Sequence, residues 1–232
     1  MRLPKVLVFT PTYDGKEYCR KEFVENVMKF TYPNFEFLMI DNSKKGNYYH
    51  KLSKNGVPVV KVPRGNSSRE GLAAAQNYAR KKALDEGFDY VLSLESDIFP
   101  PKDIIQRLLK NWKPVVGALY YIGGVGKSPK RPCVFVVKND GSNGTRLINS
   151  EEHSKLLGVG GLHRIHGMGV GCTLIDVSVL KNRVFWTDER FSNKHSDVYF
   201  YMDLWNSKVP VFVDYDIDVR HENSDWNLVQ DR

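Results

Sequence analysis

The stretch Tyr90-Val91-Leu92-Ser93-Leu94 runs directly into Glu95-Ser96-Asp97, and this junction decides how the rest of the chain is interpreted. The first five residues have the length and apolar character of a buried strand. Side chains alternate between the two faces of a strand, so Glu95 and Asp97 project to the same side if the extended geometry continues that far. Two such carboxylates suit a hard divalent cation, which takes oxygen ligands and often keeps a phosphate as partner. A solvated acidic turn is the alternative.

The first half of the chain alternates apolar strands with helices. The patterns predict strands at 5–9, 35–40, 57–62, 90–94 and 115–121, and helices at 17–30, 68–84 and 102–111. This alternation favours an α/β fold with a mostly parallel sheet and helical crossovers. In such sheets ligands bind beyond the carboxyl ends of the strands. Three strands end in polar residues: Thr10-Pro11-Thr12-Tyr13, Asp41-Asn42 and Glu95-Ser96-Asp97.

The second half has a different pattern. We expect strands at 132–137 and 209–213, a short helix at 176–180, a longer helix at 196–205 and a Gly-rich apolar segment at 169–175. Residues 138–166 have little periodicity and many turn residues, which predicts a mobile loop. Because neither a linker nor an internal repeat is evident, we predict one domain over residues 1–232, with a donor half (1–122) and an acceptor half (123–232).

The chain is basic, with a net charge of +7 and a pI near 9.2. Residues 123–166 hold seven Lys or Arg against three acids, a net charge of +4. Such a stretch indicates an anionic partner, with nucleic acid among the candidates, or else a soluble basic loop. The sequence has no apolar run of about 18 residues and no signal-peptide pattern at its start. Together with three widely spaced cysteines, this predicts a cytoplasmic protein with reduced thiols.

Asp41 closes the second predicted strand. At that position its carboxylate could accept hydrogen bonds from a uracil imide or from a ribose. The alternative is an Asx turn with Asn42 and Ser43, which requires no ligand. The residues alone leave both interpretations open.

Several segments together resemble the GT-A glycosyltransferases, and within them the family 2-like group. The segments that carry the resemblance are 6–13, 37–43, 73–79, 95–97 and 167–175. Glu95-Ser96-Asp97 takes the place of the Asp-x-Asp motif of that group. Asp197 lies where the group carries a Glu-Asp pair, and His221 lies where it carries a metal-binding His. The order and spacing of these segments, rather than any one of them, carry the resemblance.

The resemblance implies a glycosyltransferase of the hexosyltransferase type with a metal-bound nucleotide-sugar donor, UDP- or GDP-linked. Asp97 and His221 would bind Mn²⁺ or Mg²⁺, and an imidazole ligand leans towards Mn²⁺. Glu95 could reach the metal through water or hold the ribose. The implied donor-binding residues are Thr10, Pro11, Thr12, Tyr13, Asp41, Asn77, Glu95 and Ser96. Asp197 would be the general base of an inverting transfer, with Asp203, Asp188 and Glu189 as rivals.

The sequence departs from the group at three positions. Glu95 replaces the first Asp of the motif, and Ser196 replaces the Glu of the Glu-Asp pair. Gln76 stands where the group often has Arg, so a positive charge near the phosphates is missing or comes from Arg69 or Arg80. The Gln-x-x-Arg-Trp motif of processive synthases is absent from the sequence, which implies non-processive transfer.

Two other functions are consistent with parts of the sequence. A nucleotidyltransferase that makes a nucleotide-sugar shares a related fold, but no Gly-rich phosphate loop follows Phe9. A non-catalytic nucleic-acid-binding module would not need the acidic pair, and the basic-aromatic surface typical of such modules is not evident. A glycosyltransferase whose acceptor is a modified DNA base combines the basic stretch with the acidic motif.

Overall fold

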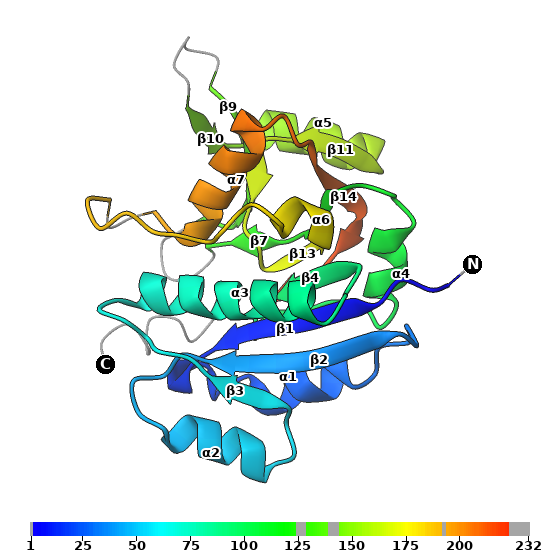
Figure 1. Ribbon diagram of the computed structural model, residues 1–232. Helices are drawn as coiled ribbons and strands as arrows, with labels where there is room; N and C mark the ends of the chain where they lie inside the picture. Colours follow the sequence, from blue (N-terminus) through cyan, green and yellow to red (C-terminus); the bar gives the residue numbers. More distant parts are fainter. Residues whose placement is uncertain (1, 124–128, 139–143, 192–193, 223–232) are drawn as a thin grey trace.

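The computed structural model describes residues 2–123, 129–138, 144–191 and 194–222. Its centre is an eight-stranded sheet (Figure 1). Across this sheet the strands follow the order β11 (Leu162–Ile165), β14 (Val211–Asp218), β6 (Val115–Leu119), β13 (Cys172–Asp176), β4 (Tyr90–Leu94), β1 (Val6–Thr12), β2 (Phe35–Asp41) and β3 (Val59–Lys61). β13 runs antiparallel to both of its neighbours and β11 is antiparallel to β14, whereas the other pairings are parallel. The predicted α/β fold with a mostly parallel sheet is confirmed.

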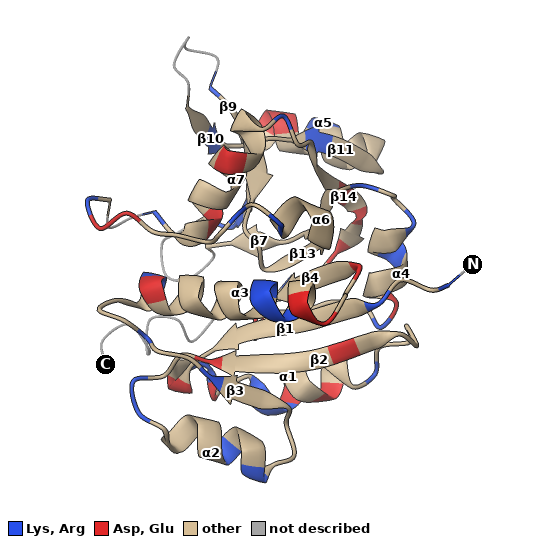
Figure 2. Cartoon of the chain, in the orientation of Figure 1, with Lys and Arg blue, Asp and Glu red and all other residues tan. Residues whose placement is uncertain are grey.

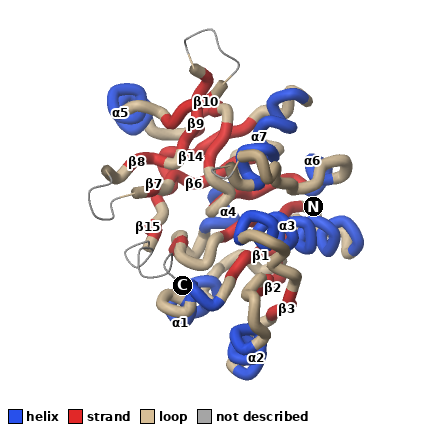
Figure 3. The backbone as a smooth tube through the Cα atoms, turned by 90° about the vertical axis from the view of Figure 1, so that its left-hand side faces the viewer, coloured by secondary structure: helices blue, strands red, loops and turns tan. Residues whose placement is uncertain are grey.

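Helices cover both faces of this sheet. The helices are α1 (Arg20–Val27), α2 (Asn47–Lys54), α3 (Ser68–Asp85), α4 (Ile104–Leu109), α5 (Ser150–Val159), α6 (Val177–Leu180) and α7 (Ser196–Asn206), with a 3-10 turn η1 (Asp14–Lys16) after β1. Figures 1 and 3 show α3, α6 and α7 on one face and α1 on the opposite face. α3 buries a row of small residues that includes Ala75, Ala79 and Ala83, which lets the helix lie close to the sheet.

Three smaller sheets complete the fold. They are β10 (Thr145–Leu147) with β9 (Val134–Val137) and β12 (Gly167–Met168), β15 (Arg220–His221) with β5 (Ile98–Phe99), and β7 (Tyr121–Ile122) with β8 (Arg131–Pro132). The antiparallel pair β5–β15 matters most for the site, because β5 follows the acidic motif directly. Its register places His221 opposite Ile98.

β1 is longer than the sequence predicted. The expected strand stopped at Phe9, before the turn residues that begin at Thr10, but β1 continues through Pro11 to Thr12. β4 pairs with β1 only as far as Phe9, so beyond that residue β1 has a single neighbour, β2. The missing N–H of Pro11 therefore costs no ladder bond on the open side. Thr10, Pro11 and Thr12 are buried, and Tyr13 is the first half-buried residue of the segment.

α3 begins at residue 68 as predicted, but its capping residue and the helix α2 differ from expectation. Ser67, not Ser68, caps α3, because its hydroxyl accepts a hydrogen bond of 3.2 Å from the Glu70 amide. α2 was not predicted at all. Only Tyr48 and Leu52 of this helix are buried, one turn apart, and two apolar positions give too weak a period to recognise.

The segment 138–166 is not the irregular loop that the sequence predicted. Within its described part lie β10, α5 and β11. α5 has no buried residue, which explains its weak periodicity. A capping box fixes its start, because the Asn149 side chain accepts from the Glu152 amide at 2.9 Å and the Glu152 carboxylate accepts from the Asn149 amide at 3.1 Å. Residues 139–143 lie outside the described residues, and the mobility expected for the segment stays a prediction.

Candidate active site

Three side chains with metal-ligating atoms meet at the carboxyl edge of the sheet. Glu95 and Asp97 follow β4, and His221 belongs to β15. One ligand atom from each lies within 4.8 Å of the others. Backbone bonds fix this convergence, since the Glu222 amide donates to the Asp97 carbonyl and the Glu95 amide donates to the Gly171 carbonyl, both at 2.8 Å. We refer to Glu95, Asp97 and His221 as the acidic cluster.

His221 presents its Nε2 atom to the cluster. Its Nδ1 atom lies 2.8 Å from the carbonyl oxygen of Tyr121, a contact that places the ring proton on Nδ1. Nε2 then faces the cluster, 3.4 Å from Asp97 Oδ2. The Nε2 atom is buried, and its neighbour is the carboxylate of Asp97. A carbonyl-oriented imidazole beside two carboxylates is a donor set that fits a divalent transition metal or Mg²⁺.

The charged neighbours of the two carboxyl groups separate their pKa values. Burial raises the pKa of Glu95 to about 7, and the nearby charge of Asp97 reinforces the shift. Burial would also raise the pKa of Asp97, but the hydrogen bond from His221 and the charge of Lys16 outweigh it and hold that pKa below its ordinary value. The pKa of His221 is raised, because the bond and charge of Asp97 outweigh burial. Asp97 is therefore the permanently ionised member of the cluster.

Lys16 is a member of the site that sequence reasoning missed. It lies in η1 with 9% of its surface exposed, and its ammonium group forms an ion pair with Asp97, which is 0% exposed. The Tyr18 hydroxyl also contacts Asp97 Oδ2, at 3.5 Å, and donates to the Glu222 carbonyl at 3.0 Å. A single lysine in a turn carries no periodic signal. The only clue was its position just after a strand that ends at the ligand-binding edge.

Asp197 lies at the start of α7 and belongs to the same electrostatic environment. Burial raises its pKa, opposed by the charge of His195, and its charge in turn raises the pKa of Glu95. Its carboxylate accepts from the Val198 amide at 2.8 Å. Asp203, the first alternative candidate for the general base, accepts a hydrogen bond of 3.3 Å from Trp186 Nε1. Asp188, another rival, is paired with Arg190 at the surface.

The predicted donor-binding residues have different surroundings. Asp41 is fully buried at the end of β2, where Ser43 donates to Oδ1 from its amide at 2.8 Å and Lys61 lies 3.3 Å from Oδ2. This is the Asx turn that the sequence offered as an alternative. The carboxamide of Asn77 forms a two-way pair with the backbone of Phe185, at 2.7 and 2.9 Å, which favours a structural role. The ring of Tyr13 lies under the Arg64 guanidinium, 5.1 Å from its centroid. Ser96 is 2% exposed.

Two departures from the glycosyltransferase pattern are in contact with one another. The Ser196 hydroxyl at the start of α7 donates to the side-chain oxygen of Gln76 in α3 at 2.5 Å. Gln76 is 1% exposed and Ser196 is 0% exposed. A neutral hydrogen bond therefore joins the two helices at positions where the related pattern has Arg and Glu. Arg69 and Arg80, offered as substitutes for the missing Arg, bind backbone carbonyls of residues 180–194 instead.

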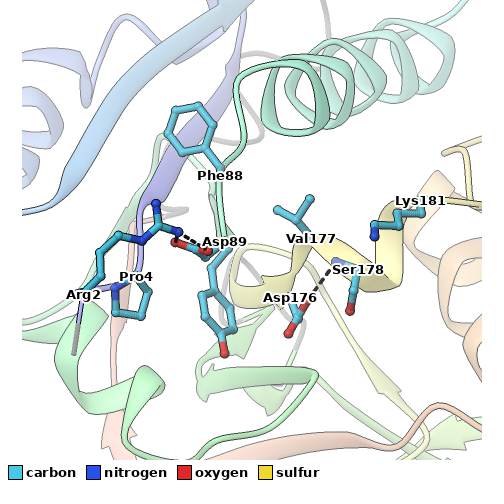
Figure 4. Close-up of a pocket in the computed structure, with 9 residues that line it drawn as sticks. Arg2, Pro4, Phe88, Asp89, Asp176, Val177, Ser178 and Lys181 are labelled. Atoms are coloured by element: carbon cyan, nitrogen blue, oxygen red, sulfur yellow. Dashed lines mark hydrogen bonds and ion pairs between the residues drawn. The ribbon is translucent and has the colours of Figure 1, made fainter.

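The opposite edge of the sheet contains a cavity of about 420 Å³. Figure 4 shows its lining residues, which include Arg2, Asp89, Asp176 and Lys181. Asp89 binds Arg2 and the Lys5 amide, and Asp176 caps α6 by accepting from the Ser178 amide. The carboxylates of Asp89 and Asp176 therefore already have hydrogen-bond partners within the protein. Because the cavity lies at the amino ends of β1 and β4, where ligands of such sheets do not bind, we do not assign it to the acidic cluster's chemistry.

The described parts of the basic stretch, residues 129–138 and 144–166, contain β8 to β11 and α5. Figure 2 shows acidic and basic residues side by side on α5. Arg146 is paired with Glu152 at 2.6 Å, so part of the positive charge counted in the sequence is neutralised locally. No helix among the described residues has the length and apolar character needed to cross a membrane.

The sequence model of glycosyl transferase family 2 matches residues 7–183. The chain belongs to glycosyl transferase family 2. Membership in this family supports glycosyl transfer. No curated protein matches the chain.

Among solved structures the family 2 chain is similar to three that illustrate its fold. Over 95% of its length it resembles GalNAc-T7, a structure with UDP, GalNAc and Mn²⁺, at 15% identity and a TM-score of 0.65. Over 97% it resembles TarS 1-349 of S. aureus at 16% identity and a TM-score of 0.58. Over 94% it resembles A197 from STIV at 16% identity and a TM-score of 0.50, covering 85% of that chain. These similarities show a GT-A fold. The chain spans 63% of TarS 1-349 and 44% of GalNAc-T7.

Proposed function

We propose that this protein is a metal-dependent, non-processive glycosyltransferase that moves a sugar from a UDP- or GDP-sugar to an acceptor hydroxyl with inversion. The observation that carries the proposal is the acidic cluster, with ligand atoms within 4.8 Å of one another at the ligand-binding edge of a GT-A sheet. Family membership supports the reaction class. The net positive charge of residues 123–166 supports an anionic acceptor, and a modified DNA base is one candidate.

Asp97, His221 and Glu95 would hold Mn²⁺ or Mg²⁺ beside the donor diphosphate. Bound there, the metal would act as a Lewis acid that stabilises the charge developing on the leaving phosphate oxygen. The raised pKa of Glu95 suits a ligand that gives up its proton when a cation arrives, because metal binding favours the deprotonated form. The Tyr121 carbonyl and the β5–β15 pairing keep the imidazole oriented.

Asp197 would serve as the general base. As the acceptor oxygen bonds to the anomeric carbon and the bond to the diphosphate breaks, the hydroxyl proton moves to the Asp197 carboxylate. The raised pKa of Asp197, caused by burial, makes it a stronger base than an ordinary aspartate. Direct displacement by the acceptor inverts the anomeric centre.

The metal part of the proposal is tested by calorimetry of UDP and of GDP with Mn²⁺ or with excess chelator. We expect tight binding of one nucleotide only with Mn²⁺, because Glu95 and Asp97 place negative charge beside the diphosphate. Asp97→Asn should lose most of this metal dependence. Asp89→Asn makes the same exchange at the opposite edge of the sheet and should behave as the wild type. Equal nucleotide affinity with chelator and with Mn²⁺ would refute a metal-dependent donor site.

A further inference from the structure

Asp97 already has a cation beside it. The Lys16 ammonium pairs with Asp97 Oδ2, the same oxygen that faces His221 Nε2 at 3.4 Å and the Tyr18 hydroxyl at 3.5 Å. Both partners of the ion pair are buried, Asp97 completely. A buried carboxylate is stable only with such compensation. Lys16 therefore neutralises the negative charge of Asp97, the carboxylate that would bind a divalent cation.

A divalent cation and the ammonium group compete for this carboxylate. Both carry positive charge, and repulsion between charges a few ångströms apart is strong where water is excluded. The His221 imidazole, held by the Tyr121 carbonyl and by β5, keeps its place. The lysine side chain, in contrast, is a point charge on a long flexible stem. Lys16 is accordingly the component of the site that can leave Asp97.

A displaced Lys16 would meet the negative charge of a bound diphosphate. The sequence lacks the Arg that related enzymes often carry at position 76, and Arg69 and Arg80 bind backbone carbonyls elsewhere. We propose that Lys16 is the resident counter-cation of Asp97, that a divalent metal must displace it, and that the displaced ammonium then binds the diphosphate of the donor. This inference rests on the proposed metal-dependent donor site.

The test uses Lys16→Met and two opposite readouts. For Mn²⁺ alone, measured by calorimetry, we expect the variant to bind roughly 10- to 100-fold more tightly than the wild type, because one positive charge has left a buried site. For UDP or GDP at saturating Mn²⁺ we expect binding about 10-fold weaker, because a phosphate-binding cation is lost. Lys51→Met is the matched control. Lys51 pairs with Glu17, one residue beyond Lys16, at 2.6 Å, and its loss should change neither affinity.

Lys16→Arg keeps the charge and should leave Mn²⁺ affinity as weak as in the wild type. If Lys16→Met does not fold, the wild-type protein with ¹³C-methylated lysines supplies a second readout. Added Mg²⁺ should shift the Lys16 resonance and leave that of Lys51 in place. An unmoved Lys16 resonance would overturn the proposal.

Unchanged Mn²⁺ affinity in Lys16→Met would overturn the competition while leaving the metal site intact. Tighter Mn²⁺ binding with unchanged nucleotide affinity would overturn the phosphate role. If neither the wild type nor Lys16→Met binds Mn²⁺, this inference fails together with the metal part of the proposed function.

Discussion

The ion pairs at the two ends of the central strands differ in their exposure to solvent. At the amino edge, Arg2 and Asp89 form an ion pair with 73% and 33% of their side chains exposed. At the carboxyl edge, Lys16 and Asp97 form one with 11% and 0% exposed. Solvent screens the first pair and leaves the second unscreened. The cavity lined by Arg2 and Asp89 therefore lies at the edge whose ion pair is exposed. The shifted pKa values of Glu95 and Asp97 lie at the other edge, which favours that edge as the place of the chemistry.

The largest expected effect comes from removing a base at the carboxyl edge. Asp197→Asn should lower turnover by about 10²- to 10⁴-fold with donor affinity nearly intact, because the amide keeps the shape of the carboxylate but cannot take the acceptor proton. Asp176→Asn is the matched control, since Asp176 also begins a helix and Asn caps equally well. Turnover and donor affinity are measured for both. If Asp197→Asn kept more than about a tenth of wild-type turnover, the base would lie elsewhere, with Asp203 the next to test.

A second effect concerns the buried contact between α3 and α7. Ser196→Glu places a carboxylate beside the Gln76 side-chain oxygen and should lower the free energy of unfolding by about 3 kcal/mol, because the new charge is buried and unpaired. Adding Gln76→Arg should restore at least half of this loss by forming an ion pair. Urea denaturation of the wild type, both single variants and the double variant measures the coupling. If the losses of the two single variants simply added in the double variant, no ion pair would have formed between positions 76 and 196.

A smaller effect is a pH dependence of metal binding. Glu95 with a pKa of about 7 is largely protonated at pH 6 and ionised at pH 8, and the metal requires the ionised form. Protonation of Glu95 alone should therefore lower Mn²⁺ affinity by roughly tenfold as pH drops from 8 to 6, and protonation of His221, whose pKa is also raised, should deepen the fall. Calorimetry in buffers of different ionisation enthalpy should find more than one proton released at pH 6, because both Glu95 and His221 must be deprotonated, and fewer at pH 8. Proton release independent of pH would contradict a shifted carboxyl group.

The smallest effect is expected at the amino edge. Arg2→Ala removes the exposed pair with Asp89 and should cost less than about 1 kcal/mol of unfolding free energy, because solvent already screens the interaction. Urea denaturation measures the change, with Mn²⁺ affinity as the second readout. If Arg2→Ala lowered the free energy of unfolding as much as Ser196→Glu, the exposed pair would not be weaker than the buried contacts at the carboxyl edge.

Much of the fold followed from the sequence because its signals are local. Apolar runs with polar ends gave β1, β2 and β4, and the junction after Leu94 located the acidic motif. The segments that were predicted poorly have little local signal. α5 has no fully buried residue and begins with a capping box, and α2 buries two residues. The first strand was predicted to end at Phe9, before Pro11, although only pairing with a distant strand decides whether the missing N–H of Pro11 matters.

The sequence predicted two of the residues that meet at the site, but few of their contacts. Asp97 and His221 were expected from their places in the chain, and the structure brings them within 3.4 Å. Lys16 was missed because nothing in its neighbourhood points to residue 97. Gln76 and Ser196 were each noted as a departure, but that they touch is a fact of tertiary packing over 120 positions. The roles of Asp197 and of the donor-binding residues stay predictions.

The pairing of β5 with β15 has a consequence for how the protein matures during synthesis. The central sheet is complete once β14 has emerged at Asp218, whereas the imidazole arrives with β15. A nascent chain can therefore bury its core before it has all three members of the acidic cluster, because domains fold as their elements emerge. A nick in the short connection between β14 and β15 would likewise spare the sheet and remove the histidine. The acidic cluster is therefore complete only in a chain that is intact through His221.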